Sequence, residues 1–229
     1  MIPYPLKGLL LGGALAMAVP SYAAAAEAEA RCGACHALTA PDTATLGLAE
    51  RLERKAPPLW YAGNKYREGW LASWLQNPSV TLPAGYFPNA AIEHTPEGDV
   101  PAPEKLHQHE PLPAAEAEAI ASELMALQPH ADLIAAVDYS PGKVALRMGT
   151  MDFRKFKGCQ ACHQDAEGEG GFSGPQLYTA WERLQPAYIV SFITDPKAWD
   201  SNTIMPQMEM NAAAVHKLAD YLRLIGGEE

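Results

Sequence analysis

Two five-residue stretches, Cys32-Gly-Ala-Cys35-His36 and Cys159-Gln-Ala-Cys162-His163, decide the fold of this chain of 229 residues. Both have the spacing Cys-x-x-Cys-His, which is typical of the attachment of c-type haem. In that chemistry the two thiols form thioether bonds to the porphyrin vinyl groups, and the histidine binds the iron as its proximal ligand. The sequence therefore predicts two haem c groups, held by all four cysteines of the chain, with His36 and His163 as iron ligands.

Other uses of paired cysteines agree less well with this pattern. A zinc site built from two Cys-x-x-Cys pairs has its halves about 15–20 residues apart, whereas Cys32 and Cys159 are 127 positions apart. A thioredoxin-like redox pair needs a βαβ setting, and no parallel-strand pattern surrounds either motif. Two isolated disulfides are the remaining alternative, but they would not explain why a histidine follows both pairs.

The N-terminal segment predicts export. Lys7 precedes an apolar run over residues 8–19, and Pro20-Ser21-Tyr22-Ala23 follows it. This order is typical of a secretory signal peptide, which we place at residues 1–23, so that the mature chain begins at Ala24 and lies in the periplasm. The run is shorter than the roughly 18 apolar residues of a spanning helix. A retained membrane anchor is the alternative, and only then would the protein contact a membrane.

The charge of the chain bears on its partners. Acidic residues number 27 and basic residues 17, which gives a formal net charge of −10. A strongly acidic protein is disfavoured as a nucleic-acid binder. It is suited to redox partner proteins that carry basic docking patches.

A second internal similarity extends beyond the cysteine motifs. Pro58-Leu59-Trp60-Tyr61 resembles Pro175-Gln176-Leu177-Tyr178, and the pairing of Leu59 with Leu177 defines an offset of 118 positions. At this offset large apolar residues and a proline fall into register: Trp70 with Tyr188, Leu71 with Ile189, Trp74 with Phe192, Leu75 with Ile193, and Pro78 with Pro196. The repeat predicts two related haem domains, at residues 24–130 and 144–229, joined by a connection at 131–143.

The apolar spacing within each copy indicates helices. Large residues recur at i, i+1, i+4 and i+5 over residues 68–77 and 186–195, and a proline stops each run. Further helices are predicted at 114–127, 211–225 and 144–157, the last with Val144, Met148 and Phe156 on its buried side. A short alanine-rich helix over 24–31 precedes Cys32. Strand signals are sparse, so the predicted fold class is all-α with long loops.

These features resemble the class I cytochrome c superfamily, specifically its two-domain dihaem members. Gly174-Pro175-Gln176-Leu177 matches a family segment beside the proximal histidine, and Pro57-Pro58-Leu59 is a looser version. The family commonly places a distal methionine before the C-terminal helix as Met-Pro. The resemblance therefore implies Met205, in Thr203-Ile204-Met205-Pro206, as the second distal ligand, with Met208 and Met210 as alternatives. In bacteria the family receives its haem outside the cytoplasmic membrane, in agreement with the predicted export.

The first copy departs from this pattern. At the offset of 118, Met205 lies opposite Phe87, which cannot bind iron. Alignment of the helices that follow, at an offset of 97, places Met205 opposite Gln108, which His107 and His109 flank. The difference is an insertion of 21 residues within 83–113. We predict His109 as the first distal ligand, with His107 as the second choice and His94, earlier in the insertion, as the third. The alternative is that all three are solvated loop histidines.

The predicted function is the transfer of single electrons between redox partners through two low-spin haems, by weak and transient docking, rather than catalysis. Two alternatives stay open. One is a peroxidase-like dihaem enzyme with an open distal site on the first haem, and the other is the haem subunit of a larger oxidoreductase complex. A sulfur-oxidising enzyme with a cysteine iron ligand is disfavoured, because no cysteine is left over.

Overall fold

The computed structural model describes residues 25–43, 45–86 and 90–227. The predicted signal peptide and Phe87 lie outside these ranges. Within them, no helix combines the length and the apolar character needed to cross a membrane.

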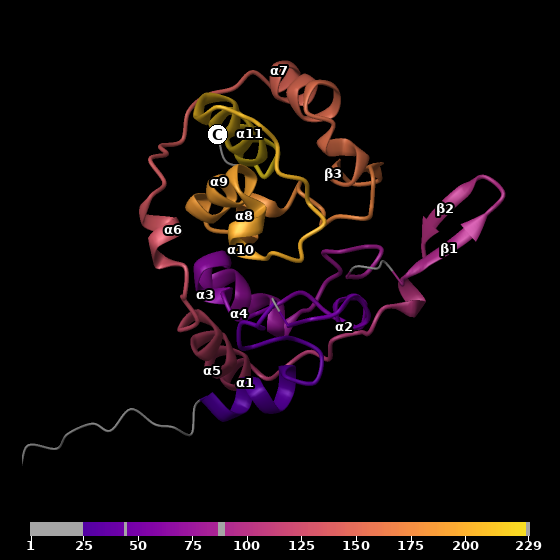
Figure 1. The fold of residues 1–229 in the computed structure, drawn as a ribbon, viewed down its shortest axis with the longest axis vertical. Helices are drawn as coiled ribbons and strands as arrows, with labels where there is room; N and C mark the ends of the chain where they lie inside the picture. The colour runs from indigo at the N-terminus through magenta and orange to yellow at the C-terminus, as the bar shows by residue number, and fades with distance from the viewer. Residues whose placement is uncertain (1–24, 44, 87–89, 228–229) are drawn as a thin grey trace, which may run out of the picture.

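Short helices dominate the architecture (Figure 1). The first half of the chain contains α1 (Ala25–Cys32), α2 (Leu48–Leu52), α3 (Ala62–Lys65), α4 (Glu68–Gln76), a 3-10 turn at Pro103–Lys105, and α5 (Ala114–Met125). The second half contains α7 (Leu146–Met151), a 3-10 turn at Cys159–Ala161, α8 (Ala180–Arg183), α9 (Pro186–Thr194), α10 (Pro196–Trp199) and α11 (Ala212–Ile225). Between them lies α6 (Ala131–Ala135).

Five of the predicted helices are confirmed with their ends within two residues: α1, α4, α5, α9 and α11. Pro196 ends α9 and is also the first residue of α10, since proline suits the first turn of a helix. The side chain of Asp195 caps α10 by accepting hydrogen bonds from the backbone N–H groups of Lys197 and Ala198.

The helix predicted at 144–157 is wrong in its length and in part of its buried face. The α-helix covers only Leu146–Met151, and a π-helical turn follows over Asp152–Phe156. This wider turn changes the helical register, so Phe153 enters the core while Phe156 is 61% exposed. Met148 is also 46% exposed, and of the three residues expected inside, Val144 alone packs against the core.

Two small hairpins add strands that the all-α expectation lacked. The first pairs β1 (Ile92–Thr95) with β2 (Gly98–Pro101), and the second pairs β3 (Gln164–Ala166) with β4 (Glu169–Gly170), both antiparallel. The β1–β2 hairpin belongs to the predicted insertion and projects away from the helices in Figure 1.

The buried side chains form two clusters, one in each half, and Tyr61 of the first half belongs to the cluster of the second. In the first half α1, α4 and α5 contribute Ala28, Leu71, Leu75, Ala117, Ile120 and Leu124. In the second half Phe153, Trp181, Ile189, Trp199, Val215 and Leu222 form the larger core. The segment expected as a connection is partly helical, and its Leu133, Ile134, Val137 and Tyr139 pack against this second core.

Backbone hydrogen bonds join the two halves. Tyr66 and Leu184, which are 118 positions apart, form an isolated antiparallel β-bridge. Beside it, the N–H of Arg67 donates to the carbonyl of Arg183 at 3.0 Å, and the N–H of Gln185 donates to the carbonyl of Lys65 at 2.9 Å. The start of α4 is thereby held against the start of α9.

Candidate haem sites

The second Cys-x-x-Cys-His motif folds as one turn that presents its histidine. The backbone N–H of His163 donates to the carbonyl of Cys159 at 3.0 Å. The ring Nδ1 lies 2.8 Å from the carbonyl oxygen of Pro175, and a carbonyl can only accept, so Nδ1 carries the proton. The other ring nitrogen, Nε2, is left with its lone pair for a metal.

The surroundings of the His163 ring fix its position and keep it neutral. A Cβ atom at Gly174 would lie 2.5 Å from the ring Cε1, so only glycine lets this loop pass so close to the imidazole. Burial lowers the pKa of His163, which favours the neutral form that binds a metal. The residue equivalent to Gly174 at the offset of 118 is Ala56.

A cavity of about 310 Å³ opens beside this motif. Its volume is within the range of about 300–1,000 Å³ typical of cofactor sites. Cys159, Cys162 and His163 line it on one side, and aromatic and aliphatic residues of α9 and α11 line it on another. The three methionines predicted as candidate ligands, Met205, Met208 and Met210, all line the same cavity.

The polar groups of this cavity suit a ligand with carboxylates. Arg183 lines it and is almost completely buried, and its guanidinium donates to Thr179 Oγ1 and to the carbonyl of Gln176. The amide atoms Oδ1 and Nδ2 of Asn202 are buried there without a hydrogen-bond partner among the described residues. Buried cationic and amide donors of this kind stabilise carboxylates, and haem carries two of them as propionates.

The first motif repeats the arrangement of the second. The His36 N–H donates to the carbonyl of Cys32 at 2.9 Å, and its ring Nδ1 lies 2.7 Å from the carbonyl oxygen of Pro57. Pro57 and Pro175 are 118 positions apart. Burial is again the largest effect on the ring and lowers the pKa of His36. Both histidines therefore have a fixed tautomer with Nε2 available.

His109, the residue that we predicted as the first distal ligand, lies next to His36. Their ring centroids are 6.0 Å apart. Because a metal–imidazole bond is about 2 Å long, a spacing of this size would allow both rings to contribute a nitrogen ligand to one metal ion. The segment is held in place because the N–H of Leu112 donates to the carbonyl of Leu75 at 2.9 Å. Burial lowers the pKa of His109 as well.

The other two histidines of the insertion lie differently. The His107 ring is 6.0 Å from the His109 ring, so His107 belongs to the same site at its edge. His94 is on β1, where its ring Nδ1 lies 2.6 Å from a carboxylate oxygen of Asp99 and its side chain is 77% exposed. The structure therefore brings His109 and His107 together with His36 but places His94 on the projecting hairpin.

The four cysteines form no disulfide bonds with one another. Burial raises the pKa of the Cys32 and Cys159 thiols. In the described part of the chain, no group of three or more histidine, cysteine or acidic side chains could hold a metal ion by itself.

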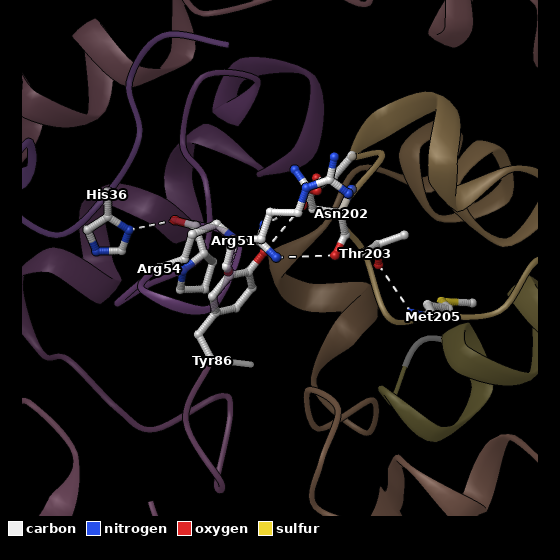
Figure 2. A network of polar contacts seen from close by, with 9 residues as sticks. His36, Arg51, Arg54, Tyr86, Asn202, Thr203 and Met205 are labelled. Carbon is white, nitrogen blue, oxygen red and sulfur yellow. Dashed lines mark hydrogen bonds and ion pairs between the residues drawn. The ribbon is translucent and has the colours of Figure 1, made fainter. Parts of the chain in front are cut away.

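The sequence analysis missed a polar network that joins the two halves (Figure 2). The Arg54 guanidinium donates to Tyr86 Oη at 2.9 Å, to Asp200 Oδ2 at 3.2 Å and to the carbonyl of Asn202 at 3.1 Å. Thr203 Oγ1 then accepts from the backbone N–H of Met205. No pattern in the sequence marks Arg54. Lys65 and Arg183, in contrast, both line the cavity and are 118 positions apart, so the repeat could have identified them.

The comparison with known proteins supports the second candidate haem site. Residues 145–222 match the family model of cytochrome c oxidase, cbb3-type, subunit III. No curated protein and no solved structure matches the chain. The match supports a cytochrome c domain over these residues, with a class I cytochrome c-like fold. Such a domain carries covalently bound haem c and serves electron transfer.

Proposed function

We propose that this protein is an exported dihaem cytochrome c that passes single electrons between redox partner proteins. The observation that carries the proposal is the repeated histidine arrangement: His36 and His163 each follow a Cys-x-x-Cys turn and each donate from Nδ1 to a proline carbonyl, at 2.7 and 2.8 Å. Since the second arrangement lies in the part of the chain that matches the cytochrome c family model, the first supports a haem of the same kind.

The assignment of residues follows from this geometry. Cys159, Cys162, His163 and Met205 would hold the second haem, and Cys32, Cys35, His36 and His109 would hold the first. When bound, haem supplies an iron that changes oxidation state by one electron. The proline carbonyls orient the proximal imidazoles, and most of the residues that line the cavity are apolar.

Electron transfer is favoured over the peroxidase-like alternative. A peroxidase requires an iron with an open or displaceable distal position, and the 6.0 Å spacing of the His36 and His109 rings supports a ligand on both sides of the first iron. The acidic character of the chain supports partners with basic docking patches. The proposed periplasmic location depends on residues 1–23, which lie outside the described residues.

A second candidate is the haem subunit of a larger oxidoreductase complex. The observation that favours it is the name of the matched family, which refers to a subunit of a cytochrome c oxidase. Purification of the native protein under mild detergent distinguishes the two. A stable complex with other polypeptides would support the subunit role, and a protein purified alone would support the free electron carrier.

Counting the haems tests the main proposal. We expect a pyridine haemochrome assay and the intact mass to give two covalent haems per chain and a mature start near Ala24. Replacement of Cys32 and Cys35 by serine should leave only the second haem. Replacement of Cys159 and Cys162 by serine should leave only the first. One haem in the unmodified protein, or haem that acid extraction removes, contradicts the proposal.

A further inference from the structure

A row of four aromatic rings leads from the first candidate site to the cavity of the second. The ring of His109 lies 4.9 Å from that of Trp74, Trp74 lies 5.9 Å from Trp70, and Trp70 lies 5.5 Å from Tyr66. Trp74 and Trp70 are stacked at an interplanar angle of 28°, and Trp70 and Tyr66 at 20°. Tyr66 itself lines the cavity that contains Cys159, Cys162 and His163.

The row follows from the helical geometry of α4. Tyr66, Trp70 and Trp74 are spaced four residues apart, and Tyr66 lies two residues before the start of α4. Their side chains therefore follow one face of the helix and of the segment that leads into it. The backbone of Tyr66 is anchored by its β-bridge to Leu184. The residues equivalent to these three at the offset of 118 are Leu184, Tyr188 and Phe192. Leu184 has no aromatic ring, so the second half has no equivalent row of three rings.

We propose that Trp74, Trp70 and Tyr66 form the path along which an electron crosses between the two haem sites. This inference rests on the proposed function, because it requires a haem in each half. With a haem held at each site, one electron would leave the first haem, which would be oxidised, and would reach the second, which would be reduced. No bond forms or breaks and no proton moves, and the rings remain neutral. The three rings fill the space between the sites with closely packed atoms. An electron tunnels faster through such atoms than across a void.

A second aromatic route provides a built-in comparison. The Trp60 ring lies 4.7 Å from that of Tyr61, and Tyr61 also lines the cavity of the second site. Trp60 and Cys35 border a smaller cavity of about 120 Å³. The route through Trp70 is favoured because its first member, Trp74, touches the ring of the proposed iron ligand His109, whereas the ring contacts of Trp60 are with Tyr61 and His130.

The test measures the rate of electron exchange between the sites in the protein with both haems attached. A short light pulse with a photoreductant places one electron on the protein, and absorbance then follows its redistribution between the two haems. We expect Trp70→Leu to slow this step several-fold and Trp70→Phe, which keeps a ring, to restore most of the rate. Trp60→Leu is the matched control, and its rate should equal that of the unmodified protein.

Separate measurements keep the result interpretable. Haem content, both midpoint potentials and the urea unfolding curve are recorded for each variant. If Trp70→Leu fails to retain both haems, Tyr66→Leu with Tyr66→Phe replaces it, because the bridge of Tyr66 to Leu184 uses the backbone alone. An unchanged rate in Trp70→Leu and Tyr66→Leu with unshifted potentials overturns the inference. So does an equal loss of rate in Trp60→Leu. A single haem in the unmodified protein would refute the proposed function instead.

Discussion

At the scale of single residues, Met205 is the predicted distal ligand of the second haem. Met208 and Met210 line the same cavity, so mutations must distinguish Met205 from them. Met205→His should lower the midpoint potential of one haem, because a thioether ligand raises the potential relative to imidazole. It should also abolish the sulfur-to-iron absorption at the red end of the oxidised spectrum. A redox titration with spectroscopy checks both effects. Met208→Leu and Met210→Leu are the controls and should leave both unchanged. A spectrum unaltered in Met205→Ala would transfer the assignment to one of them.

His109 is the residue on which the first site depends. His109→Ala should convert one low-spin signal in the electron paramagnetic resonance spectrum into a high-spin signal, because the first iron loses its distal nitrogen. His94→Ala is the matched control, since His94 lies on the hairpin with Asp99, and it should leave both low-spin signals intact. If His109→Ala and His107→Ala both leave the spectrum unaltered, the distal assignment fails. A high-spin signal in the unmodified protein would favour the peroxidase-like enzyme.

A functional residue can be predicted from the sequence when the residues that it acts with are close to it in the chain. The sequence alone is enough to identify Cys32, Cys35 and His36 as candidates, because the attachment of haem c requires the spacing Cys-x-x-Cys-His within five residues. His109 could be predicted only by alignment of the helices on either side of the insertion. Arg54 and Asn202 could not, because their roles arise from contacts with residues about 150 positions away in the chain.

At the scale of elements, β3 is fixed to α11 and to the π-helical turn by one buried carboxylate. The side chain of Asp165 is fully buried and accepts hydrogen bonds from Arg154 at 2.9 and 2.8 Å and from Tyr221 Oη at 2.6 Å. Arg154→Met removes two charge-assisted bonds and leaves this carboxylate with Tyr221. We expect a loss of about 1–3 kcal/mol in the free energy of unfolding, measured by urea denaturation.

The matched control for Arg154 is an ion pair on the same turn. Lys217 lies 3.1 Å from Asp152, and its side chain is half exposed. Lys217→Met should change the free energy of unfolding by less than about 1 kcal/mol. Equal effects of the two substitutions would show that the burial of Asp165 is not the cause of the difference.

The elements differ in how well a sequence pattern predicts them. The helices α4 and α9 have a clear apolar spacing and a proline after it, so their bounds are predictable. The π-helical turn is not, because its register is set by Phe153 and by the close approach of Tyr221 to Gly149, where a Cβ would lie 2.3 Å from the tyrosine ring. The hairpins contain only two to four residues per strand, too few for an alternating pattern.

At the scale of the whole molecule, Arg54 connects the halves through Asp200, whose side chain is 9% exposed. Arg54→Met leaves this carboxylate without its cation and removes a positive charge that lines the second cavity. We expect a lower free energy of unfolding, by about 1–3 kcal/mol. A lower midpoint potential of the second haem should accompany it, because a nearby positive charge favours the reduced iron.

Arg51 is the control for this prediction. It lies close to Arg54 (Figure 2), but its guanidinium donates to the carbonyls of Thr43 and Leu46 in its own loop. Arg51→Met should leave the midpoint of the second haem in place. If Arg54→Met and Arg51→Met shift the midpoint potential equally, the loss of a positive charge explains the shift. The contact of Arg54 across the two halves then has no separate effect. At this scale the sequence predicted the repeat, but it could not predict which surfaces of the two copies meet.

The bridge between Tyr66 and Leu184 joins each residue to its own counterpart, as contacts do across the two-fold axis of a dimer. The same axis would exchange the two flanking bonds with each other, since Gln185 is the counterpart of Arg67 and Arg183 is the counterpart of Lys65. A pair of sites related by such an axis has no preferred direction, because rotation about the axis exchanges donor and acceptor. In the proposed dihaem protein, the direction of electron flow is therefore encoded where the symmetry is broken, by the insertion that carries His109 on one side and the Met205 loop on the other.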